Sequence, residues 1–190
     1  MIEHLKDRLP LLRNFWFQWI LANLIGWTAG LWGGLLLATR LSGIGLLGWM
    51  AGGALTGTVV GYCQAAVLWD RVDLKVGRWI GLSAMAGAIA ATTIPFSAGL
   101  VYPLGWFATE AASGAWFGAL LGSVQAIMLR QRFKNIHWTP WVIFAGALCG
   151  LFSLPITQFH LIVTVMIGPA LFGIITGIPL SRASQASEKS

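Results

Sequence analysis

Glycines recur at every fourth position along one face of three hydrophobic segments of this chain. The first two segments carry three such glycines each, and the third carries two, with Pro169 in the equivalent first place. In an apolar helix of about 20 residues, this spacing removes the side chains from one stripe and lets another helix approach closely. The glycines predicted to pack helices are Gly53, Gly57, Gly61, Gly114, Gly118, Gly122, Gly173 and Gly177.

The composition excludes a soluble globular domain. Apolar residues make up 57% of the 190 positions and charged residues only 9%, against roughly a quarter charged in ordinary domains. The mean hydropathy of +0.75 agrees, and runs of about 20 apolar residues are typical of transmembrane helices. Six spans are predicted, at Phe15–Ala38, Ile44–Trp69, Trp79–Ala98, Leu104–Leu129, Trp141–Thr157 and Leu161–Leu180.

The distribution of Lys and Arg predicts the orientation of the chain. Eleven of the 12 basic residues fall on the side of both termini, and only Arg40 falls on the other. The positive-inside rule therefore predicts cytoplasmic tails at 1–14 and 181–190 around a membrane domain at 15–180, in a bacterial inner or thylakoid membrane. Because the charges are scattered among short loops, the net charge of +6 indicates contact with membrane lipid rather than with nucleic acid.

An internal repeat is visible in the sequence. Residues 57–68 (GTVVGYCQAAVL) match residues 118–129 (GALLGSVQAIML) at a shift of 61, and a weaker copy at 173–180 (GIITGIPL) follows at a further 55. In that third copy Leu180 replaces the glutamine. Each unit starts and ends on the same side, so the copies are parallel repeats. The predicted fold is an all-α integral membrane protein of six helices, with two-helix repeats at about 15–75, 76–137 and 138–180 in a pseudo-threefold bundle.

The repeated unit carries a resemblance. The pattern Gly-x-x-x-Gly-x-x-Gln-x-x-x-Leu-Arg, followed by a basic turn and a tryptophan, is met in full from Gly118 to Arg130. It is met less fully from Gly57 to Leu68, where Trp69 replaces the arginine. The chain in this respect resembles a loose group of uncharacterised bacterial multi-pass membrane proteins built from such helix pairs. The resemblance implies the architecture and no particular activity.

Glu110 is the one acidic residue that falls inside a predicted span, and ionisable residues there are functional candidates. It precedes Arg130 by 20 residues, or about 30 Å of helix, which places it near the outer boundary of the membrane. One interpretation makes Glu110 a ligand for an ion, a proton or a pigment metal. The other, which we favour, pairs it with Arg40, the sole base on that side, and requires the first and fourth spans to lie close together.

Gln64 and Gln125 each follow a glycine of the packing stripe by three residues. They lie about 8–9 Å inside the cytoplasmic end of their helices. The two amides either line a small polar vestibule or bond across helices, an interaction worth on the order of 0.6 kcal/mol and at most ~2 kcal/mol in membranes. We favour the interhelical hydrogen bond.

Tryptophans gather near the predicted ends of the spans and indicate an aromatic belt at each interface, with pigment or lipid stacking as the alternative. They are Trp16, Trp19, Trp69, Trp79, Trp138 and Trp141 at one end, and Trp49 and Trp106 at the other. No cofactor is predicted, and a pigment or lipid role stays open.

These features favour a non-catalytic integral membrane protein, a structural, assembly or accessory subunit that acts through helix packing. One version attaches it to the subunits of a larger bioenergetic or photosynthetic complex. A small transporter or channel is the alternative. An enzyme is not predicted, because the spans hold no paired acid and base, and Cys63 and Cys149 share no metal-ligand spacing with the histidines.

Overall fold

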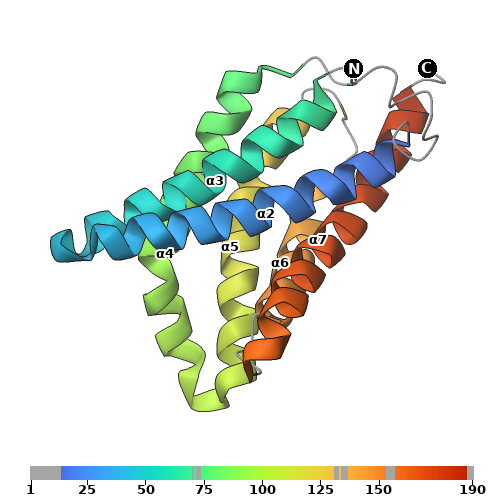
Figure 1. Cartoon of the computed structure of the whole chain (residues 1–190). Coiled ribbons are helices and arrows are strands. Elements are labelled where there is room, and N and C mark those ends of the chain that lie inside the picture. The colour runs from blue at the N-terminus through green and yellow to red at the C-terminus, as the bar shows by residue number, and fades with distance from the viewer. Residues whose placement is uncertain are drawn as a thin grey trace.

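The computed structural model describes residues 14–69, 71, 74–130, 133, 137–152 and 157–187. Within these ranges the chain forms six α-helices and two short 3-10 turns (Figure 1). The prediction of an all-helical chain with six helices is confirmed. The helices are α2 (Phe15–Arg40), α3 (Leu46–Leu68), α4 (Val76–Val101), α5 (Trp106–Leu129), α6 (Trp138–Phe152) and α7 (Thr157–Ser187).

Four of these helices are long and apolar enough to cross a membrane. They are α2, α3, α4 together with the 3-10 turn that follows it, and α5. In the described residues, α6 and α7 contribute shorter apolar stretches, Trp138–Leu151 and Met166–Ser181. Membrane lipid is therefore the natural surrounding of the apolar surface that the helices expose.

Two hairpin turns have the same construction. A 3-10 turn follows α2 at Ser42–Ile44 and α4 at Tyr102–Leu104, and a glycine then leads into the next helix. These glycines, Gly45 and Gly105, have φ angles of 60° and 97°. Such positive angles are readily adopted by glycine and rarely by residues with a Cβ. Each glycine thereby lets the chain reverse direction within a few residues.

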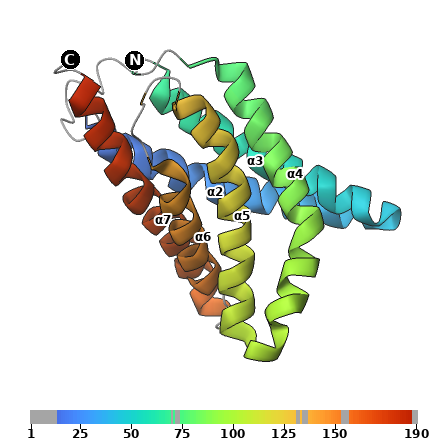
Figure 2. The ribbon, with the colours of Figure 1, turned by 180° about the vertical axis from the view of Figure 1, so that it is seen from behind.

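The six helices form a closed ring. Each helix contacts its neighbours in the sequence, and α7 returns to contact α2. Among the described residues no other pair of helix backbones comes close, although side chains meet across the ring: the rings of Trp27 in α2 and Phe117 in α5 lie 5.1 Å apart, centre to centre. Seen from behind, α6 and α7 lie on one side of the molecule, α4 lies on the other, and α5 runs between them (Figure 2).

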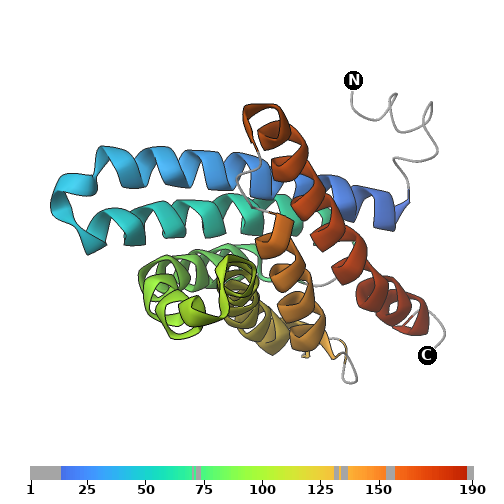
Figure 3. The same cartoon turned by 90° about the horizontal axis from the view of Figure 1, so that it is seen from below.

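The helices converge at one end of the ring and diverge toward the other. The start of α2 and the end of α7 lie at the converging end, together with the helix ends that flank the α3–α4 and α5–α6 connections (Figure 1). From there the α2/α3 hairpin projects away from α4 and α5, as the view from below also shows (Figure 3). The diverging ends are apolar and open, with Leu36 60% and Leu100 84% exposed. The core is therefore concentrated where the helices meet.

Candidate functional site

The glycine stripe of α3 lies against α4. Gly53 packs on the backbone of Gly87, and Gly57 packs on the carbonyl of Ser83. A Cβ built on Gly61 would lie 2.8 Å from Ser83 Cβ. All three glycines are buried, and the contacts leave no room for side chains.

The stripes of α5 and α7 are placed in the same way. Gly114 packs on Gly146 of α6, and a Cβ on Gly122 would lie 2.8 Å from Val142 Cβ. The remaining contacts are those of Gly118 with Val142 and Ile143, of Gly173 with Ile20 and Asn23, and of Gly177 with Trp16 and Trp19. Each predicted stripe therefore packs on the first helix of the following hairpin, with α7 closing onto α2.

A fourth stripe, which the sequence reasoning missed, joins α2 to α3. Gly26 packs on Val60 and Cys63, Gly30 on Thr56, and Gly34 on Gly52 and Thr56. The Thr56 hydroxyl also donates to the carbonyl of Gly30 at 2.9 Å. The signal was present, because Gly26, Gly30 and Gly34 repeat at every fourth position. Within this hairpin the two helices are in close contact along most of their length.

A chain of hydrogen bonds between uncharged side chains crosses the converging end. Asn23 Nδ2 donates to the carbonyl of Trp19 at 2.9 Å, and Gln64 Nε2 donates to Asn23 Oδ1 at 2.9 Å. Gln125 Nε2 donates to Gln64 Oε1 at 2.7 Å, and Trp138 Nε1 donates to Gln125 Oε1 at 3.2 Å. The four side chains are at most 1% exposed. They link α2, α3, α5 and α6, so the two glutamines bond across helices and do not line an open vestibule.

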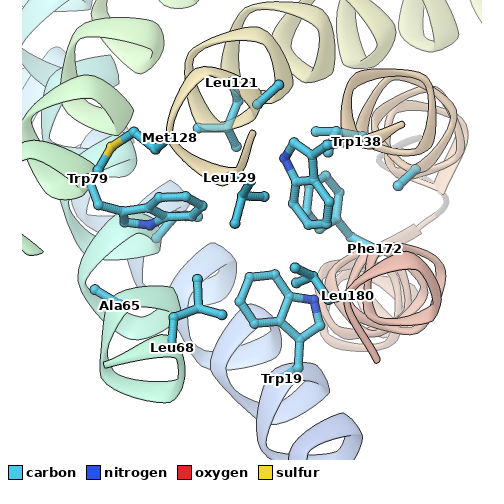
Figure 4. Close-up of a cluster of buried hydrophobic side chains, with 14 of the residues drawn as sticks. Trp19, Ala65, Leu68, Trp79, Leu121, Met128, Leu129, Trp138, Phe172 and Leu180 are labelled. Carbon is cyan, nitrogen blue, oxygen red and sulfur yellow. The ribbon is translucent and has the colours of Figure 1, made fainter. Parts of the chain in front are cut away.

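Three tryptophans and three leucines fill the space beside this chain (Figure 4). The tryptophans come from α2, α4 and α6 and the leucines from α3, α5 and α7. Trp19 Nε1 donates to Thr176 Oγ1 of α7 at 2.9 Å. We name the set the tryptophan–leucine cluster: Trp19, Trp79, Trp138, Leu68, Leu129 and Leu180, all at most 1% exposed.

The cluster corrects the prediction of an aromatic belt at this end. Trp19, Trp79 and Trp138 are core residues rather than interface residues, because the converging helices enclose them. Trp16 and Trp69 are exposed, as are Trp49 and Trp106 near the hairpin turns. Tryptophan side chains, which are apolar but carry one N–H group, occur both in cores and at membrane interfaces. Their position near helix ends in the sequence therefore did not show which tryptophans are buried.

Two polar groups of α4 stand apart from the hydrogen-bond chain. Trp79 Nε1 and Ser83 Oγ are buried and have no hydrogen-bond partner among the described residues. Ser83 is fully buried, and its Oγ lies 3.0 Å from the position of a Cβ on Gly61. Buried polar groups without partners are rare in folded proteins.

The structure does not bring Glu110 and Arg40 together. Glu110 is part-buried near the start of α5, and its carbonyl contacts Gly150 of α6. Arg40 is exposed at the end of α2. The two helices meet through Trp27 and Phe117, whose ring centres lie 5.1 Å apart, but the helix ends that carry Arg40 and Glu110 lie at different hairpin turns (Figure 1). The expected pairing of Glu110 with Arg40 is wrong, because α2 and α5 diverge toward the ends that carry these two residues (Figure 1).

The described residues contain no group of three or more His, Cys, Asp or Glu side chains that could hold a metal ion. Cys63 and Cys149 are free thiols, and Cys149 Sγ donates to the carbonyl of Gly168 at 2.9 Å. The buried polar side chains among the described residues are all uncharged.

Comparison with protein-family models, with curated proteins and with solved structures found no match.

Proposed function

We propose that this chain is a non-catalytic integral membrane protein, an assembly or accessory subunit that acts through helix packing. The observation that carries the proposal is the hydrogen-bond chain from Asn23 to Trp138. Its buried polar groups bond to one another and join four helices, so they serve to hold the ring together. The proposed partners of the protein are membrane lipid and other membrane-protein subunits. In one version of the proposal these subunits belong to a bioenergetic or photosynthetic complex.

We propose further that the ring consists of three two-helix repeats around a pseudo-threefold axis. We call each contact between two successive hairpins (α3 with α4, α5 with α6, and α7 with α2) a seam. In support of the repeat, one glycine at each seam faces two residues of the next hairpin: Gly61 faces Ile80 and Ser83, Gly122 faces Thr139 and Val142, and Gly173 faces Ile20 and Asn23. By this criterion Gly173 is the equivalent of Gly122, and the shift between the second and third copies is 51 residues. That shift is one helical turn shorter than the 55 residues that the glycine pattern suggested. Thr176, rather than Leu180, then takes the place of Gln125.

The proposed orientation puts both termini in the cytoplasm. Its support is that exposed basic residues lie at the converging end, among them Lys75 and Arg78 at the start of α4 and Arg130 at the end of α5. Arg71 lies at the same end, where it donates to Gln18 Oε1 at 3.3 Å and its guanidinium carbon stands 5.1 Å from the centre of the Phe15 ring. Such residues face the anionic cytoplasmic leaflet in most membrane proteins.

A small transporter or channel is the second candidate function, and one observation favours it. The hairpins diverge away from the converging end, as an open vestibule would require (Figure 3). Against a conducting path stands the tryptophan–leucine cluster, which fills the middle of the ring with fully buried apolar groups. A path through this layer would require the tryptophans to move.

The deciding experiment is affinity purification of the tagged chain from native membranes under mild detergent. The assembly proposal expects one or more membrane proteins to co-purify with the wild type and to be lost in Gly118→Leu, which places a side chain on the backbone of α6. Gly81→Leu is the matched control, because a Cβ there meets nothing within 4 Å. Recovery of the wild type as a chain without partners, together with solute flux in liposomes, would favour the transporter.

A further inference from the structure

We propose that Trp79, Ser83 and Gln64 hold one buried water molecule at the seam between α3 and α4. The three side chains are at most 1% exposed. The indole nitrogen of Trp79 lies on the side of its ring that faces α3, which carries Ala65 and Leu68 (Figure 4). The water would join α4 to the hydrogen-bond chain that links α2, α3, α5 and α6.

The register of the seam places Gln64 opposite Trp79. Gly61 of α3 faces Ile80 and Ser83 of α4, and the two helices run antiparallel. Gln64 lies three residues beyond Gly61, and Trp79 lies four residues before Ser83. Both offsets move about one turn toward the converging end, so the two inward-facing side chains meet at the same level.

The other two seams show what a tryptophan does at this level. Trp138 Nε1 donates to Gln125 of α5, and Trp19 Nε1 donates to Thr176 of α7. At the α3/α4 seam the corresponding acceptor, Gln64 Oε1, instead accepts from Gln125 Nε2 at 2.7 Å. Gln64 Oε1 thus already accepts one hydrogen bond, and Trp79 Nε1 has no direct partner among the described residues.

The chemistry of these groups selects a small neutral ligand. Trp79 Nε1 can only donate, whereas the Ser83 hydroxyl can donate or accept and the Gln64 carbonyl has a second lone pair. A ligand that accepts from the indole and donates to an oxygen satisfies all three groups. The surrounding side chains of the hydrogen-bond chain are uncharged, so an ion would have no counter-charge. Water fits both requirements and commonly joins buried polar groups in this way.

The test is magnetisation transfer from water to the indole N–H groups of the protein, labelled with 15N-tryptophan in lipid nanodiscs. Trp79→Phe assigns the Trp79 signal. We expect a water cross-peak at Trp79 and none at Trp19 or Trp138, which donate to protein oxygens at equal burial. These two tryptophans are internal controls for solvent leakage.

Ser83→Ala provides the second measurement. It removes the hydroxyl that binds the water, so the Trp79 cross-peak should fall at least twofold. Ser113→Ala is the matched control and should leave it unchanged, because the Ser113 hydroxyl bonds to the carbonyl of Thr109 within its own helix. The proposal is overturned if the wild type shows no water cross-peak at Trp79. It is also overturned if Ser83→Ala leaves that cross-peak at full intensity.

Discussion

Replacing Gln125 by leucine, a residue of similar size, removes the middle of the hydrogen-bond chain. Two bonds are lost, the donation to Gln64 Oε1 at 2.7 Å and the acceptance from Trp138 Nε1 at 3.2 Å. Gln125 is 1% exposed, so bulk solvent does not reach either bond. Interhelical bonds in membranes contribute about 0.6 kcal/mol on average and at most about 1.7 kcal/mol. The expected loss in the free energy of unfolding is therefore on the order of 1–3 kcal/mol.

The assay is reversible unfolding in mixed micelles, with Ser113→Ala as the control. That hydroxyl bonds within α5, so its removal should change the free energy by less than about 0.5 kcal/mol. A double-mutant cycle with Gln64→Leu isolates the bond itself, because the double variant no longer leaves one amide unpaired. The double variant should be less destabilised than the sum of the single variants. Additive losses, or no loss in Gln125→Leu, would refute the role assigned to the chain.

Three further predictions concern packing, charge and orientation. Gly118→Leu should destabilise the protein by about 3 kcal/mol or more, because a Cβ at this position already overlaps the backbone of α6; Gly81→Leu should stay near wild type in the same micelle assay. Arg40→Ala should change stability by less than about 0.5 kcal/mol and show no coupling to Glu110→Gln, since the helix ends that carry the two residues lie at different hairpin turns (Figure 1); a measurable coupling would contradict this arrangement. A reporter fused after residue 190 should be active on the cytoplasmic side, and activity only on the outer side would reverse the proposed orientation.

Much of the fold followed from local pattern. Long apolar runs predicted six helices and their bounds to within a few residues at most ends, because apolar helical segments satisfy their own backbone hydrogen bonds. The last helix differs most, since α7 continues to Ser187 beyond the predicted end at Leu180. Gln64 and Gln125 were singled out by their place on the glycine face. Asn23, which accepts a hydrogen bond from Gln64, lies on α2, and the glycine stripe of α2 was not used in the prediction.

The candidate site depended on facts that a linear pattern does not contain. Burial of Trp19, Trp79 and Trp138 follows from the convergence of three hairpins, whereas the sequence shows only tryptophans near helix ends. The pairing of Glu110 with Arg40 rested on charge alone, and charge does not state which helices are neighbours. The orphaned polar groups of Trp79 and Ser83 became visible only when each buried donor could be matched with an acceptor.

The sequence by itself determined that the chain is helical and apolar, and which helix faces lack side chains, because these properties depend on composition and on the 3.6-residue period. Only the tertiary structure decided that each predicted stripe packs on the following hairpin and that α7 returns to α2. The physical reason is that glycines repeated every four residues present the same packing surface after a shift of about one helical turn. They also allow close approach by any helix with small side chains on its facing surface, so the repeat alone specifies neither the register nor the partner helix. In the structure the side chains of Ser83 and Val142 lie against Gly61 and Gly122, whereas Gly57 and Gly118 meet the main chain of the same two residues.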